Sequence, residues 1–221
     1  PEDLEGITVT NARESEHVAQ YTEFLYRRLQ RQGYLQRDVE RMVNLDRNIF
    51  AACMVEFGHA DTMVTGLTRN YHSALRDVQR VIDTTPGAPV FGLTMIVARG
   101  RTLFVADTAV HERPTQEELA RIAIESAAAV KRLGHEPKVA ILSYSNFGNP
   151  QGIITERVRG AMTLLNEAAA AGKIDFEFDG EMNVDVALDP DRTLYPFCRL
   201  SGAANVLVMP GLHAATIATK L

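Results

Sequence analysis

The sequence has few cysteines, no tryptophan and no long apolar run. Only Cys53 and Cys198 occur among its 221 residues, which argues against a disulfide scaffold and favours reduced, buried thiols. No apolar stretch approaches the roughly 18 residues that a membrane helix needs. The acidic start PEDLEGITV is unlike the basic beginning of a secretory signal peptide. These absences predict a cytoplasmic protein without a membrane partner.

Positive charge and metal-binding patterns are scarce as well. The chain has 23 Lys and Arg against 28 Asp and Glu, a net charge of −5, and no basic stripe interleaved with aromatic residues, so nucleic acid is not expected as a partner. The six histidines lie far apart and no CxxC or HExxH pattern occurs. A metal site is therefore not expected. The glycine-rich nucleotide-binding patterns G-x-G-x-x-G and G-x-x-x-x-G-K-[ST] are absent too.

The first 58 residues carry helical patterns. Val18, Tyr21, Leu25 and Leu29 recur at helical spacing and predict a helix ahead of Gly33. Asp38 is a candidate cap for a second helix, and a third apolar stripe runs from Ile49 to Gly58. We therefore expect residues 1–58 to form a helical segment.

From residue 59 onward the pattern alternates between strands and helices. Short β-rich runs are bounded by glycine, proline or asparagine, and capping residues precede helical runs. Such alternation predicts an α/β unit over residues 59–221, with three αβα layers and a mostly parallel, mixed sheet. The first expected elements are a strand at 61–66, a helix capped by Thr68, a hairpin at 90–105 and a helix after the Thr115–Glu118 capping box. A strand at 139–142 and a helix at 153–171 follow. The last are a strand that runs into a turn at Asp179–Gly180, a short helix through Asp185 and a strand at 205–209.

Small polar residues gather at three of these strand ends. Ligands of parallel sheets bind beyond the carboxyl ends of strands, where loops lead into helices. The candidate ligand-binding residues are Thr65, Gly66, Thr68 and Arg69, then Ser143 and Ser145, and finally Asp179, Gly180, Glu181 and Asp185. Each group also has a structural interpretation: helix caps and a surface arginine, a serine-rich turn, or acids suited to a helix start. Together they predict one shared cleft, and no single residue is predicted to be catalytic.

Five stretches of the chain resemble the phosphate acetyltransferase family. They are DTMVTGLTRNY, FVADTAVHERPTQEELARIAIESA, PKVAILSYSNFGN, FDGEMNVDVAL and GAANVLVMPGLHAATIATKL. The spelling of RNIFAACMVEFGHADTMVTGLTRNY, SYSNFG and FEFDGEMNVDVAL is closer to a subset, the acetyltransferase-like C-terminal domain of bacterial hybrid NADP-dependent malic enzymes. The resemblance implies a fold like that of isocitrate and isopropylmalate dehydrogenases. It also implies that this sequence covers an internal part of that domain.

The resemblance implies a regulatory function. In that subset the domain resembles an acetyl-CoA sensor that supports homo-oligomer formation, and the N-terminal malic enzyme domain of the same chain would hold NADP and a divalent metal, Mg or Mn. Ser145-Asn146-Phe147-Gly148 departs from the serine-threonine-lysine-glycine pattern of authentic acetyltransferases, and Ala215-Thr216 replaces their glycine-asparagine pair. The resemblance also implies that this sequence lacks the nicotinamide and malate sites and part of the acetyltransferase cleft, so the fragment alone is expected to catalyse neither malate oxidation nor acetyl transfer. The alternatives are a true phosphate acetyltransferase and a pure assembly module.

Overall fold

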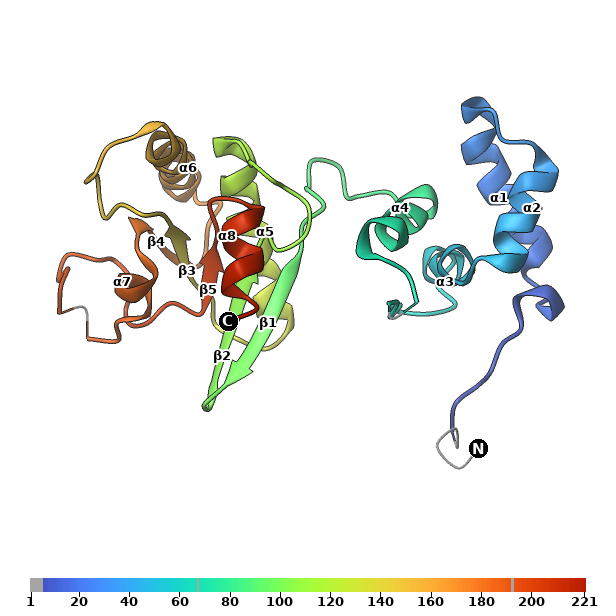
Figure 1. The fold of residues 1–221 in the computed structure, drawn as a ribbon, viewed down its shortest axis with the longest axis horizontal. Coiled ribbons are helices and arrows are strands. Elements are labelled where there is room, and N and C mark those ends of the chain that lie inside the picture. The colour runs from blue at the N-terminus through green and yellow to red at the C-terminus, as the bar shows by residue number, and fades with distance from the viewer. Residues whose placement is uncertain (1–5, 67, 192) are drawn as a thin grey trace. The chain divides into compact units, whose positions relative to one another are not determined.

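A computed structural model describes residues 6–66, 68–191 and 193–221. The chain divides into two compact units, Pro1–Thr85 and Pro86–Leu221. The first runs from blue to green-cyan in Figure 1, and the second from green to red. Each unit has its own apolar core, so each is described by itself.

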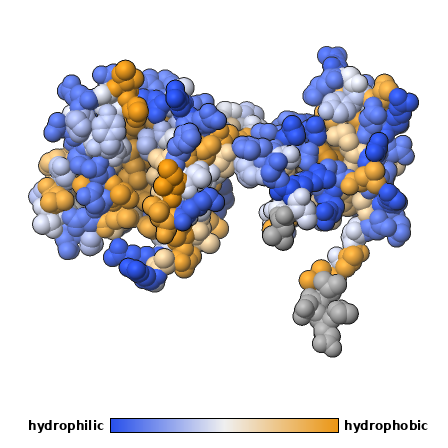
Figure 2. Space-filling view, in the orientation of Figure 1, coloured by the Kyte–Doolittle hydropathy of each residue, from blue (hydrophilic) through white to orange (hydrophobic). Residues whose placement is uncertain are grey.

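The first unit is built from four α-helices. They are α1 (Val18–Leu29), α2 (Gln36–Leu45), α3 (Arg47–Glu56) and α4 (Tyr71–Val81), with short 3-10 turns at Ala12–Glu14 and Gln30–Gln32. Their apolar stripes meet in a core that includes Tyr21, Leu25, Val39, Val43 and Ile49. Hydrophilic residues cover much of the visible surface of this unit in Figure 2. Helix α4 adds Val81 to that core, so the unit extends to Thr85, beyond the predicted helical segment.

Three local expectations in this unit are wrong. Residues 62–66 have no strand conformation. A strand needs a hydrogen-bonded neighbour, and in the described part of the chain none pairs with them, while Val64 is 96% exposed. Thr68 does not cap α4, because Asn70 accepts the backbone N–H of Ser73 at 2.9 Å instead. Asp38 lies inside α2, where its carboxylate accepts the Leu35 N–H at 3.2 Å.

The second unit contains a five-stranded sheet. Its strands are β1 (Leu93–Ala98), β2 (Arg101–Ala106), β3 (Lys138–Leu142), β4 (Glu177–Met182) and β5 (Val206–Val208), in the spatial order β1-β2-β5-β3-β4. Strands β2, β5, β3 and β4 are parallel. The edge strand β1 pairs antiparallel with β2 through a two-residue turn, Arg99–Gly100, with φ of 51° and 75°, typical of a tight hairpin. The predicted hairpin and mostly parallel sheet are confirmed.

Helices cover both faces of the sheet. Alternate residues of each strand point to opposite faces, so Phe104 and Ala106 of β2 pack on one side with α5 (Gln116–Arg132) and α6 (Ile153–Ala170). Val105 packs on the other side with α7 (Val184–Leu188) and α8 (Leu212–Ala218). Figure 1 shows α6 and α7 on opposite sides of the strands. The predicted three-layer αβα architecture is confirmed.

The expected turn at Asp179–Gly180 is wrong. An Asp-Gly pair favours a turn locally, but both residues lie inside β4, where Asp179 pairs with Ala140 and Gly180 with Ile141. Pairing with the buried strand β3 therefore overrides the local preference. Among the described residues, no helix is long and apolar enough to cross a membrane.

Candidate functional site

A buried carboxylate supports the loop after β3. Glu181, at the end of β4, is 1% exposed. Its Oε1 accepts the Ser145 hydroxyl at 2.6 Å and the Gly148 N–H at 3.0 Å, and the Arg159 guanidinium of α6 lies 3.4 Å away. The structure thus joins two of the predicted strand ends, because Ser145 follows β3 and Glu181 ends its neighbour β4.

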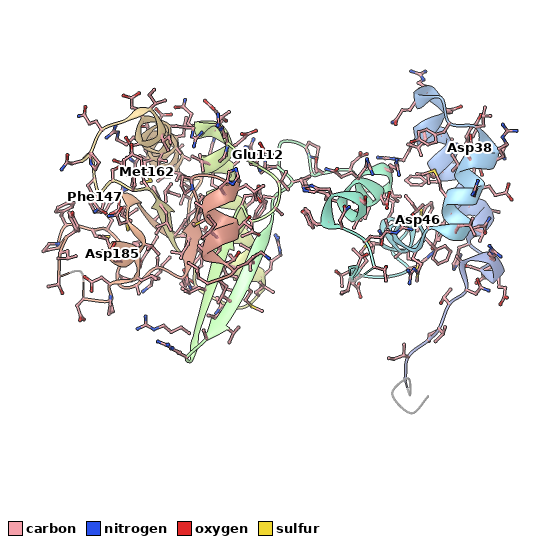
Figure 3. All side chains as sticks on the ribbon, viewed as in Figure 1. Asp38, Asp46, Glu112, Phe147, Met162 and Asp185 are labelled. Carbon is pink, nitrogen blue, oxygen red and sulfur yellow. The ribbon has the colours of Figure 1, made fainter. Side chains whose placement is uncertain are left out.

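The same loop leaves two buried oxygen atoms without partners. Within the described residues, neither the Ser143 hydroxyl nor Oε2 of Glu181 has a hydrogen-bond partner. Phe147, labelled in Figure 3, closes the loop by packing on Tyr195 and Phe197, with ring centroids 5.3 and 4.9 Å away. The two serines therefore differ: Ser145 is held by Glu181, whereas the buried Ser143 hydroxyl has no hydrogen-bond partner among the described residues.

This difference gives a test with a matched pair of variants. Ser145→Ala would leave buried Glu181 without its hydroxyl donor, so we expect the free energy of unfolding to fall by about 1–3 kcal/mol. Ser143→Ala removes a hydroxyl that bonds nothing, so a change within about 0.5 kcal/mol is expected. Urea unfolding followed by circular dichroism measures both. Equal losses in the two variants would contradict the assignment.

The remaining predicted residues at β4 and α7 have different surroundings. Asp179 is buried and binds Arg199, whose backbone N–H lies 2.7 Å from one carboxylate oxygen and whose guanidinium Nη2 lies 2.9 Å from the other. Gly180 of β4 pairs with Ile141 of β3, and the two backbones approach closely at this point. Asp185, labelled in Figure 3, is exposed in the first turn of α7.

The sequence analysis missed a buried aspartate at the end of β2. Asp107 is 3% exposed, and it accepts the N–H groups of Gly92, Ala109 and His111 at 2.7–2.8 Å. The His111 ring Nδ1 lies 2.6 Å from it. Burial alone would raise the pKa of the Asp107 carboxyl, but the N–H donors outweigh it and lower that pKa. The available signal was an aspartate directly after a strand with a histidine four residues later.

In the helical unit, the predicted residues Thr65, Thr68 and Arg69 belong to a polar network. Thr65 donates to the side chain of buried Asn48 at 2.5 Å. Arg69 binds Asp46, labelled in Figure 3, and lies 3.0 Å from Asp77. The hydrogen bond that Arg69 donates to Asp46, and the negative charge of Asp46, raise the pKa of the Arg69 guanidinium, which therefore stays charged.

Two hollows flank Thr68 and Arg69. One, of about 420 Å³, is lined by Arg47, Asn48, Ala51, Met63, Val64, Thr65, Gly66, Thr68 and Arg69. The other, of about 410 Å³, is lined by Thr68, Arg69, Asn70, Ser73, Arg76 and Asp77. Both place arginine side chains beside hydroxyl groups, which is a setting that suits phosphate.

A metal site would need a cluster of side chains that could bind the ion. In residues 6–66, 68–191 and 193–221, no group of three or more His, Cys, Asp or Glu side chains is placed to hold a metal ion.

Known proteins match this chain over nearly all of its length. It is 58% identical to the NADP-dependent malic enzyme of Rhizobium meliloti (strain 1021), covering 99% of this chain but 28% of that protein. It is 31% identical to the phosphate acetyltransferase of Acetivibrio thermocellus, covering 99% of this chain and 68% of that protein. The EutD phosphotransacetylase structure from Staphylococcus aureus superposes with a TM-score of 0.86 at 28% identity, covering 99% of this chain and 66% of that one. Residues 2–221 match the phosphate acetyl/butaryl transferase model, so the chain belongs to that family and corresponds to the acetyltransferase-like part of the NADP-dependent malic enzymes.

Proposed function

We propose that this chain is an acetyl-CoA-responsive regulatory and oligomerisation domain of a cytoplasmic NADP-dependent malic enzyme. The parent reaction would be the oxidative decarboxylation of malate to pyruvate and CO2. The observation that carries the proposal is the 58% identity to a malic enzyme over 99% of this chain. NADP and the divalent metal, Mg or Mn, would bind in the N-terminal malic enzyme domain.

The polar loops support a binding function in which acetyl-CoA is sensed and not consumed. The hollows beside Thr68 and Arg69 offer cations and hydroxyl groups for the phosphates of the coenzyme. In the α/β unit, the Ser143 hydroxyl has no hydrogen-bond partner among the described residues. The proposed coupling to the remote malic enzyme domain is of the usual size for two distant sites, about 1–3 kcal/mol.

The test is malate oxidation by the whole protein that carries this sequence, with and without acetyl-CoA. We expect saturating acetyl-CoA to lower the rate by about 5–150-fold. This fold-change corresponds to a coupling free energy of about 1–3 kcal/mol if the rate follows the affinity for malate. CoA without the acetyl group is the matched control ligand. An unchanged rate at an acetyl-CoA concentration shown to saturate binding would reject regulation. A monomer by light scattering would reject the oligomerisation part.

The second candidate function is acetyl transfer between CoA and phosphate. It is favoured by the 31% identity to the Acetivibrio thermocellus phosphate acetyltransferase, of which this chain covers 68%. Formation of acetyl-CoA from acetyl phosphate and CoA by the whole protein would support it. Phe147, which packs on Tyr195 and Phe197, places an apolar ring in the loop after β3, which favours sensing over transfer.

A further inference from the structure

Two arginines at the loop 65–69 have different electrostatic surroundings. Arg69 bridges Asp46 and Asp77, and Asp77 also lies 2.9 Å from Arg80. Asp46 is fixed in turn, because its carboxylate caps α3 by accepting the N–H groups of Asn48 and Ile49 at 2.9 and 3.3 Å. The positive charge of Arg69 is therefore balanced by these two carboxylates. The ion pairs hold Arg69 against the start of α3 and against α4.

Arg47 is placed differently. It is the first residue of α3, and its guanidinium donates to the Thr68 hydroxyl at 3.3 Å. Among the described residues no carboxylate lies within ion-pair distance of it. The cluster of Arg47, Arg69 and Arg80 with Asp46 and Asp77 has three positive and two negative charges, so one positive charge remains. That charge sits on Arg47, at the wall of the 420 Å³ hollow.

The rest of this hollow suits an anion attached to a larger apolar group. Its polar wall comes from Arg47, Thr68 and the backbone at Gly66, where φ is +148° and no side chain fills the space. Its apolar lining includes Ala51, one helical turn after Arg47 in α3, and Met63. A phosphate would meet the guanidinium and the hydroxyl, while an organic portion would contact the apolar lining.

We propose that Arg47, at the start of α3, is the anion-recognising residue of this hollow, and that Arg69 is a positioning residue. The ligand class is an organic phosphate. Its identification as a phosphate of acetyl-CoA rests on the proposed function, whereas the recognition of phosphate by Arg47 does not. The Thr68 hydroxyl, held now by Arg47, turns to the phosphate as a second donor when the ligand binds.

The experiment compares four forms of the whole protein by isothermal titration calorimetry: wild type, Arg47→Ala, Arg47→Lys and Arg41→Ala. Arg41 is an exposed arginine of α2 in the same unit, so its variant controls for loss of one charge. The probes are acetyl-CoA, adenosine 3′,5′-bisphosphate and inorganic phosphate. We expect Arg47→Ala to weaken organic phosphate binding by about 10- to 100-fold, as for one charge-assisted hydrogen-bonded contact. Arg47→Lys should lose less, and Arg41→Ala less than about twofold.

A second readout separates binding from folding. Arg47→Ala should keep the wild-type melting temperature, whereas Arg69→Ala should lower it, because Asp46 and Asp77 would lose their shared cation. Binding of the bisphosphate that depends on Arg47, without acetyl-CoA binding, would reject the proposed function and support this inference. Wild-type affinity in Arg47→Ala, or no binding of any probe by the wild type, would overturn the inference.

Discussion

Gly180→Ala should destabilise the α/β unit strongly, by about 2–5 kcal/mol, through backbone strain and steric overlap. The φ of Gly180 is +153°, and a Cβ atom there would lie 2.7 Å from the carbonyl oxygen of Ile141 and 3.0 Å from its Cβ. Ile141 is completely buried in β3, so its backbone cannot move aside without disturbing the core. The new methyl group would push β3 and β4 apart where they pair.

The matched control is Gly202→Ala. A Cβ at Gly202 would meet only Lys138 Nζ, at the ordinary distance of 3.5 Å, so its effect should stay within about 0.5 kcal/mol. Urea unfolding followed by circular dichroism suits this chain, which has no tryptophan to report by fluorescence. If both variants unfold at the same urea concentration, the strain assigned to Gly180 is absent.

Asp107→Asn should lower the free energy of unfolding by about 2–4 kcal/mol at neutral pH. The carboxylate accepts the N–H groups of Gly92, Ala109 and His111. An asparagine can offer only one oxygen, and its amide NH2 would face N–H donors in a buried site. Asp175→Asn is the control, because Asp175 is an exposed aspartate paired with Lys131.

The pH dependence of this effect has a defined sign. The hydrogen bonds outweigh burial and lower the folded-state pKa of Asp107, whereas an unfolded aspartate has a pKa of about 3.9. The carboxylate therefore contributes stability above about pH 4, and that contribution is lost as pH falls through the lowered folded-state value. The difference in the free energy of unfolding between wild type and Asp107→Asn should be largest above pH 4 and shrink below it. A difference that grows on acidification would contradict this account.

The sheet could be predicted from sequence because its signals are local. The Thr115–Glu118 capping box forms as expected, with the Glu118 N–H donating to the Thr115 hydroxyl at 3.2 Å. The Arg99–Gly100 pair forms its hairpin turn, and the apolar run of β3 is buried. Each pattern contains the residues that make its own hydrogen bonds or core contacts, so no distant partner has to be known.

The errors arose where a distant neighbour decides the structure. Residues 62–66 have strand-like composition but no strand partner among the described residues. Asp179–Gly180 has turn-like composition but pairs with β3. Arg69 pairs with Asp46, which caps α3, and with Asp77 of α4. These ion pairs cannot be predicted from the sequence of the loop that contains Arg69. The prediction that all three polar loops share one cleft stays a prediction.

Among the five described strands, the middle strand of the sheet comes latest in the sequence. Strand β5 lies between β2 and β3, and Asn205, just ahead of it, ties the start of β3 by accepting the Lys138 N–H at 2.7 Å. While the ribosome has yet to release residues 205–208, the nascent chain can form only the separate ladders β1–β2 and β3–β4. The apolar clusters on the two faces of the sheet therefore close late, through contacts between segments far apart in the chain. This order slows folding and leaves the edges of β2 and β3 open to chaperones until β5 has been synthesised.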